Sequence, residues 1–99
     1  MNKTKILNLI GLATRARLTS VGTDVVIGSI QRKDAKIVFV VNDASAETIK
    51  RVKDKCNYYQ VLCVTEFNTD ELNSAIGKGN IKILSINDKG FYESIKALI

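Results

Sequence analysis

The run Ile37-Val38-Phe39-Val40-Val41 constrains the fold more than any other stretch of the chain. Consecutive β-branched and aromatic residues are typical of a β-strand. A strand without polar residues at alternate positions has to be covered on both of its faces. Helices are the usual cover on both faces of a sheet, so this one run already favours an α/β architecture.

Strand and helix patterns alternate along the rest of the chain. Apolar runs predict further strands at 61–65 and 81–86, with a weak, short strand at 18–21. Helical periodicity and end signals predict helices at about 3–16, 22–34, 46–57, 68–77 and from 87 or 88 onward. The sequence therefore predicts one domain over residues 1–99, a three-layer α/β/α sandwich with a central mixed sheet of about four strands.

The predicted helices carry recognisable end signals. Thr23 is placed to cap the second helix, and Asp24 suits the positive end of its dipole. Glu71 is placed to reach back to Asn68 in a capping box. Along the third helix, i,i+4 spacing predicts Glu47–Arg51 and Lys50–Asp54 ion pairs. Ligands of open α/β sheets tend to bind where strands end and helices begin. Here those junctions are Gly22–Asp24, Asn42–Ser45 and Asp88–Gly90, with the turn Gly77–Asn80 as a neighbour of one of them.

The charge of the chain favours a polyanionic partner. Fifteen Lys and Arg residues face ten Asp and Glu residues, which gives a net charge of +5. A merely soluble basic protein fits this balance equally well. No apolar stretch approaches the roughly 18 residues of a membrane span. No signal-peptide core of about 7–15 apolar residues is present either, so we expect a cytoplasmic protein.

Little in the sequence supports catalysis. Histidine, the commonest general base and metal ligand, is absent. Cys56 and Cys63 are too widely spaced for a CxxC pair, and their apolar neighbours predict buried structural thiols. The segment Gly77–Asn80 lacks the spacing of a P-loop. We expect no cofactor, no metal and no small-molecule substrate, although lysine or carboxylate bases leave an enzyme open as a distant alternative.

The stretch from Arg15 to Asp24 carries the main candidate site. Guanidinium groups bind phosphate bidentately, and Arg15 and Arg17 precede a helix start at Gly22 whose free N–H groups suit an anion. Asp24 repels phosphate but can accept hydrogen bonds from the amino group of a base. Solvated cations at a helix end and a simple N-terminal carboxylate explain the same residues without a ligand. The predicted RNA-contacting residues are Arg15, Arg17, Gly22, Thr23, Asp24 and Lys78.

The adjacent pair Tyr58-Tyr59 admits two interpretations. Tyrosine rings can stack on unpaired bases. Because the pair directly follows the third helix, packing and turn formation are the preferred interpretation.

The order and spacing of several segments resemble the L7Ae/L30e ribosomal proteins that bind kink-turn RNA, with the bacterial YlxQ-type branch as the best match. These segments are Gly11–Arg17, Gly22–Asp24, Ala35–Val40, Asn42–Ser45, Lys55–Tyr59, Leu72–Lys78 and Asp88–Phe91. The resemblance covers nearly the whole chain. It implies an α/β/α sandwich without catalysis that binds structured RNA, ribosomal or other, and we expect a monomer.

At the second helix, the family that the chain resembles carries the pattern Gly-x-Asn-Glu-x-x-Lys. Gly22 matches the glycine, whereas Asp24, Val25 and Gly28 replace the other three residues. The loop Lys78–Asn80 is polar where that family has an apolar loop over flipped bases. These departures keep an alternative open, a protein-interaction module that kept the fold but lost kink-turn recognition.

Overall fold

β2 (Ile37–Val40) lies inside the central sheet, and all four of its residues are buried. In the computed structural model, which describes residues 1–99, Ile37 and Phe39 belong to one apolar cluster. Val38 and Val40 belong to a second cluster on the other face of the sheet. The absence of alternation in this run is therefore the signature of a strand with helices on both sides.

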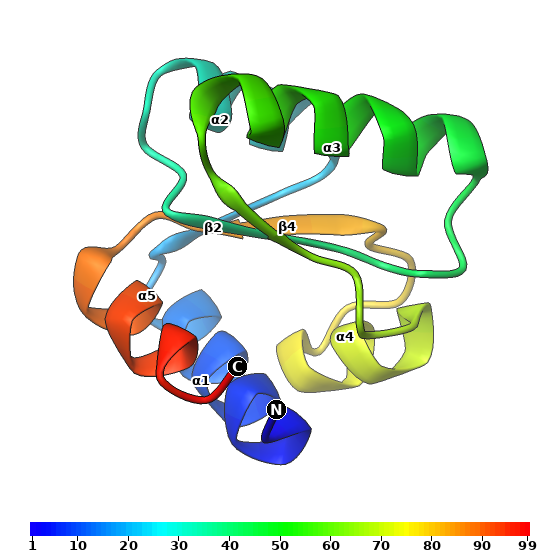
Figure 1. Cartoon of the computed structure of the whole chain (residues 1–99). Coiled ribbons are helices and arrows are strands. Elements are labelled where there is room, and N and C mark those ends of the chain that lie inside the picture. Colours follow the sequence, from blue (N-terminus) through cyan, green and yellow to red (C-terminus); the bar gives the residue numbers. More distant parts are fainter.

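Five helices and four strands form the predicted three-layer sandwich. Helices α2 and α3 cover one face of the sheet, and α1, α4 and α5 cover the other (Figure 1). The elements are α1 (Lys3–Arg15), β1 (Thr19–Val21), α2 (Thr23–Gln31), β2 (Ile37–Val40), α3 (Ala46–Tyr59), β3 (Leu62–Val64), α4 (Thr69–Ile76), β4 (Ile83–Ile86) and α5 (Lys89–Lys96). None of the helices has the length and apolarity needed to cross a membrane.

The strand order is β1-β4-β2-β3. β4 runs antiparallel to both β1 and β2, while β3 runs parallel to β2, so β1, β2 and β3 share one direction. The helices that follow these three strands, α2, α3 and α4, consequently all begin on the side of the sheet where the carboxyl ends of β1, β2 and β3 lie. The junction Asp88–Gly90 follows β4 and lies at the opposite edge, away from the junctions at Gly22–Asp24 and Asn42–Ser45.

Most of the predicted helix ends are confirmed, and one is wrong. Asn68 and Glu71 form the capping box, with the Glu71 N–H donating to Asn68 Oδ1 at 2.8 Å and the Asn68 N–H donating to Glu71 Oε1 at 3.0 Å. Thr23 does not cap α2, because it is already the first helical residue. Gly22 is the N-cap and supplies no side-chain hydrogen bond. Its φ of +94° suits glycine and would strain a threonine.

β4 begins at Ile83 rather than at the predicted Ile81, because the backbone of Ile81 is hydrogen-bonded to a side chain and not to a neighbouring strand. The Ile81 N–H donates to the buried Asn73 Oδ1 at 2.7 Å, and Asn73 Nδ2 donates to the carbonyls of Ile81 and Thr69, both at 2.8 Å. This amide fixes the turn between α4 and β4 to α4. Cys56 is buried as predicted, whereas Cys63 is half-buried, and both are free thiols.

Helices α1 and α4 touch at Gly11. A Cβ atom added to this buried glycine would lie 2.7 Å from the carbonyl oxygen of Ala75. Real Cβ atoms do not approach backbone oxygen this closely, so only glycine allows the two helices to pack at this separation.

We expect Gly11→Ala to destabilise the protein, although alanine favours a helix over glycine by about 1 kcal/mol. Overpacking of this kind costs roughly 1–3 kcal/mol, which exceeds the gain in propensity. Urea unfolding measures the difference. The matched control is Gly79→Ala, where no atom lies within 4 Å of the new Cβ and the effect should stay within about 0.5 kcal/mol. A Gly11→Ala protein as stable as the wild type would refute the close helix contact.

Candidate nucleic-acid interface

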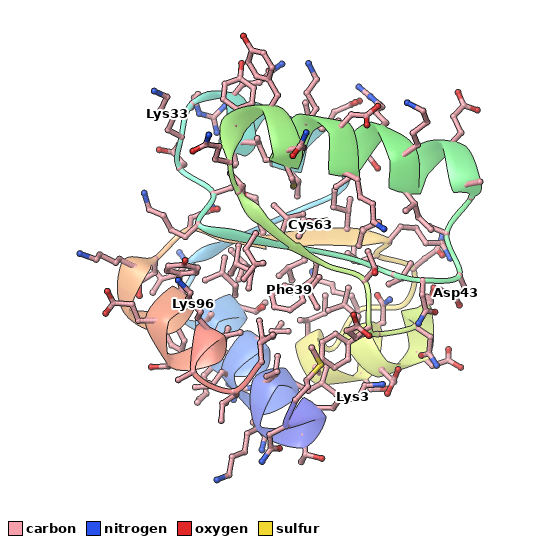
Figure 2. All side chains as sticks on the ribbon, in the orientation of Figure 1. Lys3, Lys33, Phe39, Asp43, Cys63 and Lys96 are labelled. Atoms are coloured by element: carbon pink, nitrogen blue, oxygen red, sulfur yellow. The ribbon has the colours of Figure 1, made fainter.

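The candidate site lies where α2, α3 and α4 begin, at the carboxyl ends of β1, β2 and β3. We call it the helix-start edge and define it by Gly22–Asp24, Asn42–Ser45, Asn68–Thr69 and the turn 77–82. Backbone hydrogen bonds hold these segments or their direct neighbours together. The Gly22 N–H donates to the Ile83 carbonyl at 3.1 Å, the Val41 N–H donates to the Lys82 carbonyl at 2.9 Å, and the Asn42 N–H donates to the Phe67 carbonyl at 2.9 Å. Figure 2 shows Asp43 at this edge, on the side opposite Lys33.

The start of α2 is open to a ligand. Its first N–H groups, on Thr23, Asp24 and Val25, have no carbonyl four residues earlier in the helix, and no side chain caps them. Free N–H groups together with the positive end of the helix dipole form a site for an anion. Val25, also in this first turn, exposes 56% of its surface.

Asp24 is paired with a residue from the neighbouring helix. Arg51 Nη2 on α3 lies 3.6 Å from Asp24 Oδ1, and the Asp24 side chain is 93% exposed. The ion pair observed for Arg51 is thus with Asp24 and not with the predicted Glu47, whereas the predicted Lys50–Asp54 pair is confirmed at 2.6 Å. An exposed pair of this geometry contributes little to stability and is readily exchanged for another partner. Arg51 places a guanidinium group beside the start of α2, and no local pattern in the sequence indicates this contact.

Asp43 joins the beginnings of α3 and α4. Its Oδ1 accepts hydrogen bonds from Thr69 Oγ1 at 2.7 Å and from the Thr69 N–H at 3.0 Å. These bonds, the side-chain bond foremost, lower the pKa of Asp43 below its ordinary value. Lys82 Nζ donates to the same Thr69 hydroxyl at 3.2 Å, which places a half-buried ammonium group within the helix-start edge.

The structure separates the two arginines from the start of α2. Arg17 follows α1, and the carbonyl of the next residue, Leu18, accepts the Asn87 N–H at 2.8 Å, where β4 ends. Gly22 lies beside Ile83, where β4 begins, so the length of β1 lies between Arg17 and Gly22. The opposite placement follows from the antiparallel pairing of β1 with β4.

Arg15 lies in a groove between α1 and α4. Its Nη1 atom would be 3.6 Å from a Cβ on Gly11, and Ser74 and Ala75 of α4 line the same hollow of about 420 Å³. Neither Arg15 nor Arg17 forms an ion pair. Of the predicted residues, Gly22, Thr23 and Asp24 are contiguous at the helix-start edge. Lys78 is exposed on the turn that leads into β4 at the same edge.

Sequence comparison places this arrangement among known proteins. The family model described as "Ribosomal protein L7Ae/L30e/S12e/Gadd45 family" matches residues 4–98. The chain belongs to this family.

Two curated relatives are similar over nearly their whole length. "RNA-binding protein YlxQ" of Enterococcus faecium is 47% identical over 98 residues, which are 99% of this chain and 94% of the relative. "RNA-binding protein YlxQ" of Bacillus subtilis (strain 168) is 40% identical over 91 residues, which are 92% of this chain and 91% of the relative. The resemblance read from the sequence is therefore confirmed.

Solved structures support the fold. A protein of unknown function from Bacillus halodurans C superimposes with a TM-score of 0.90 at 35% identity, covering 95% of each chain. The Giardia lamblia 15.5kD RNA binding protein superimposes with a TM-score of 0.82, covering 100% of this chain and 92% of its own. Its 17% identity restricts that likeness to the fold.

The hydrogen bonds to Asp43 predict a dependence of stability on acidity. An unfolded aspartate titrates near pH 3.9, and the folded pKa of Asp43 is lower. Its contribution to stability is therefore fully present above about pH 4 and is lost as the pH falls through the folded pKa. Asp43→Asn cannot titrate, so we expect its stability to decrease less than that of the wild type below about pH 4.

Urea unfolding at a series of pH values measures this difference. Thr69→Val removes the hydroxyl that donates to Asp43 while keeping the shape of the side chain, and we expect it to reduce the acid sensitivity as well. Parallel losses of stability in Asp43→Asn and the wild type would contradict the role assigned to the Asp43–Thr69 bonds.

Proposed function

We propose that the protein is a non-catalytic RNA-binding protein that contacts structured RNA through its helix-start edge. The observation that carries the proposal is the start of α2, where N–H groups lack a side-chain cap on the surface of a chain with a net charge of +5. An anion fits this geometry without displacing any protein group. The two YlxQ relatives, at 47% and 40% identity, are named RNA-binding proteins, which favours RNA among the polyanions that could bind here.

The residues of the helix-start edge make different contacts with the RNA in this proposal. The free N–H groups of Thr23, Asp24 and Val25 offer main-chain contacts to a phosphate, and Lys78 and Lys82 supply positive charge around it. Gly22, whose own N–H donates to the Ile83 carbonyl, has no side chain and leaves room for the phosphate. Asp24 accepts hydrogen bonds from a base amino group, while Arg51 offsets the repulsion between its carboxylate and the RNA backbone. Arg15 and Arg17 remain part of the proposal as outlying contacts. Only an RNA that extends beyond the helix-start edge reaches them.

The finer proposal is a kink-turn-like RNA, ribosomal or other. It rests on the family to which the chain belongs and on the match of Gly22 to the glycine of the pattern in its second helix. Asp24, Val25 and Gly28 depart from that pattern. We therefore expect binding that is weaker and less selective for the kink than binding by a protein with the full pattern.

Charge reversal at the helix-start edge tests the RNA-binding surface. We expect Lys78→Glu to weaken binding to a kink-turn oligonucleotide and to make the slope of log K against log salt shallower by about 0.7–0.9, the loss of one phosphate contact. Arg17→Glu at the opposite edge should have a smaller effect. Electrophoretic mobility shifts at several salt concentrations measure both.

Lys89→Glu is the matched control, because it makes the same charge change in α5, on the other side of the sheet from α2. Circular dichroism verifies that every variant stays folded. Equal losses of affinity in Lys78→Glu, Arg17→Glu and Lys89→Glu would show that net charge alone attracts the RNA. An Arg15→Glu/Arg17→Glu double variant that abolishes binding while Lys78→Glu does not would move the surface to α1.

Restoring the family pattern tests the kink-turn proposal. We expect the triple variant Asp24→Asn, Val25→Glu, Gly28→Lys to bind kink-turn RNA at least about tenfold more tightly, since each good base contact contributes roughly 1–3 kcal/mol. A side chain at Gly28 fits, because its Cβ would meet only the movable Arg32 Nη1 at 3.1 Å. The control RNA is the same sequence with its bulge paired. An equal gain on both RNAs would refute kink-turn selectivity.

The departures at the second helix also support a second function, a protein-interaction module. Val25, in place of a glutamate, exposes an apolar side chain at the α2 start. Affinity purification after nuclease treatment separates the two functions. Protein partners that persist without RNA crosslinks would favour the module.

A further inference from the structure

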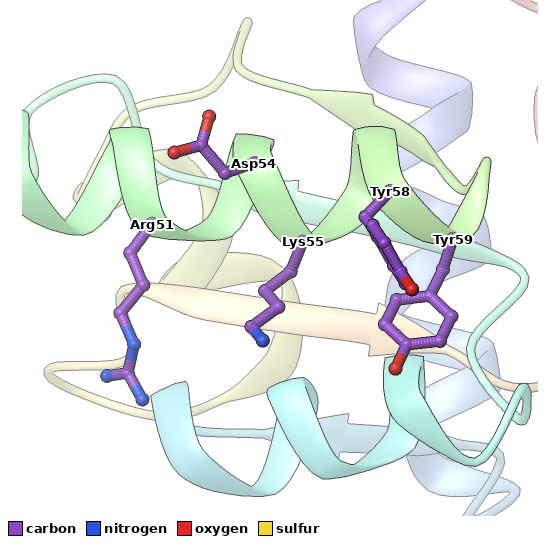
Figure 3. Close-up of a pocket in the computed structure, with 5 residues that line it drawn as sticks. All are labelled: Arg51, Asp54, Lys55, Tyr58 and Tyr59. Carbon is purple, nitrogen blue, oxygen red and sulfur yellow. The ribbon is translucent and has the colours of Figure 1, made fainter.

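Three side chains of α3 line one hollow. Arg51, Lys55 and Tyr58 are spaced i, i+4 and i+7, which places them on a single face of the helix. Together with Asp54 and Tyr59 they surround a hollow of about 530 Å³ on the outer surface of the α2–α3 layer (Figure 3). We call it the α3 hollow.

Tyr58 is the most exposed large apolar side chain of the protein, at 78%. Its ring meets the ring of Tyr59 edge-on, with centroids 4.8 Å apart and planes at 72°. Tyr59 in turn packs against the apolar cluster between the sheet and the α2–α3 layer. Tyr59 thus supports the Tyr58 ring from the side. The packing predicted from the sequence is confirmed for Tyr59, whereas the Tyr58 ring contacts the Tyr59 ring and is otherwise exposed. The prediction that the pair follows the third helix is wrong, because both tyrosines belong to the last turn of α3.

The charges of the α3 hollow are unequal. The only carboxylate among its lining residues, Asp54, lies 2.6 Å from Lys50 Nζ, so its charge is already matched. Figure 3 shows the Asp54 carboxylate turned away from the side on which Arg51 and Lys55 extend. Lys55 forms no ion pair, and the exposed Arg51–Asp24 pair at 3.6 Å is loose. The hollow therefore presents two cations beside an exposed aromatic ring.

We propose that the α3 hollow binds an unpaired nucleotide of the RNA, with the base stacked on Tyr58 and the adjacent phosphates held by Arg51 and Lys55. The inference rests on the proposed function and extends it from the helix-start edge across α3. An aromatic ring flanked by cations suits a nucleotide, because stacking uses the face of any base while the cations neutralise the backbone. Arg51 belongs to both surfaces through its contact with Asp24, so one continuous RNA strand can cross from one to the other.

The position of the ring supports stacking further. Tyr58 is the penultimate residue of α3, which ends at Tyr59 because Gln60 takes a left-handed conformation. The ring is therefore carried on helical backbone and not on a flexible loop. Little conformational freedom remains to be lost when a base stacks on it.

The test compares two fluorescently labelled RNAs, a kink-turn duplex and the same duplex with a single-stranded oligouridine extension. We expect the extension to increase affinity for the wild type in fluorescence anisotropy titrations. Tyr58→Ala should lose this gain, by roughly 5- to 150-fold, the range for one base stacked on an aromatic ring. Tyr58→Phe, which keeps the ring and removes the hydroxyl, should retain the gain. On the extended RNA, Arg51→Gln and Lys55→Gln should each reduce the salt slope by roughly 0.7.

The outcomes separate this inference from the proposed function. Binding of the plain duplex without any gain from the extension, or an unchanged gain in Tyr58→Ala, would overturn the α3 hollow alone. Absence of binding to either RNA by the wild type would overturn both. Lys89→Gln, with the same charge change in α5, should leave the gain intact, and photocrosslinking through iodouridine in the extension should label Tyr58.

Discussion

The burial of β2 between two apolar layers is the constraint on which the rest of the structure depends. Alternate residues of one short strand enter two separate clusters, one with α1, α4 and α5 and one with α2 and α3. Burying apolar surface stabilises a fold by roughly 25 cal/mol per Å². Neither layer of helices can bury its apolar side without the strand between them. The arrangement of strands around β2 then brings three helix starts to one edge, and the candidate site is a consequence of that topology.

Two close contacts position α4 and the turn before β4, which form part of the candidate site. Gly11 lets α4 approach α1, and the amide of Asn73 ties the turn before β4 to α4. The Asp43–Thr69–Lys82 network then connects α4 to the end of β2. The position of Lys82 is therefore set by buried packing and a chain of hydrogen bonds. A cation fixed in this manner differs from Lys78, which extends freely from an exposed turn.

Local patterns in the sequence predicted the layers, the capping box at Asn68 and the short strands correctly, because propensity and hydrophobic periodicity act over a few residues. They failed for contacts made by distant segments. The pairing of Arg51 with Asp24 depends on how α2 packs against α3, and the capture of Ile81 by Asn73 depends on the path of a turn. Arg15 and Arg17 are close to Gly22 along the chain but not in space, because β1 carries the chain across the sheet between them.

The uncapped start of α2 has a consequence for the timing of recognition. Where a serine or aspartate caps a helix, an incoming anion has to displace that side chain before it reaches the N–H groups. Gly22 has no side chain to displace, and its positive φ is held by the hydrogen bond from its N–H to the Ile83 carbonyl on the neighbouring strand. An anion that binds as proposed therefore has no helix cap to displace, and we expect its rate of association to depend on diffusion and on long-range attraction between charges.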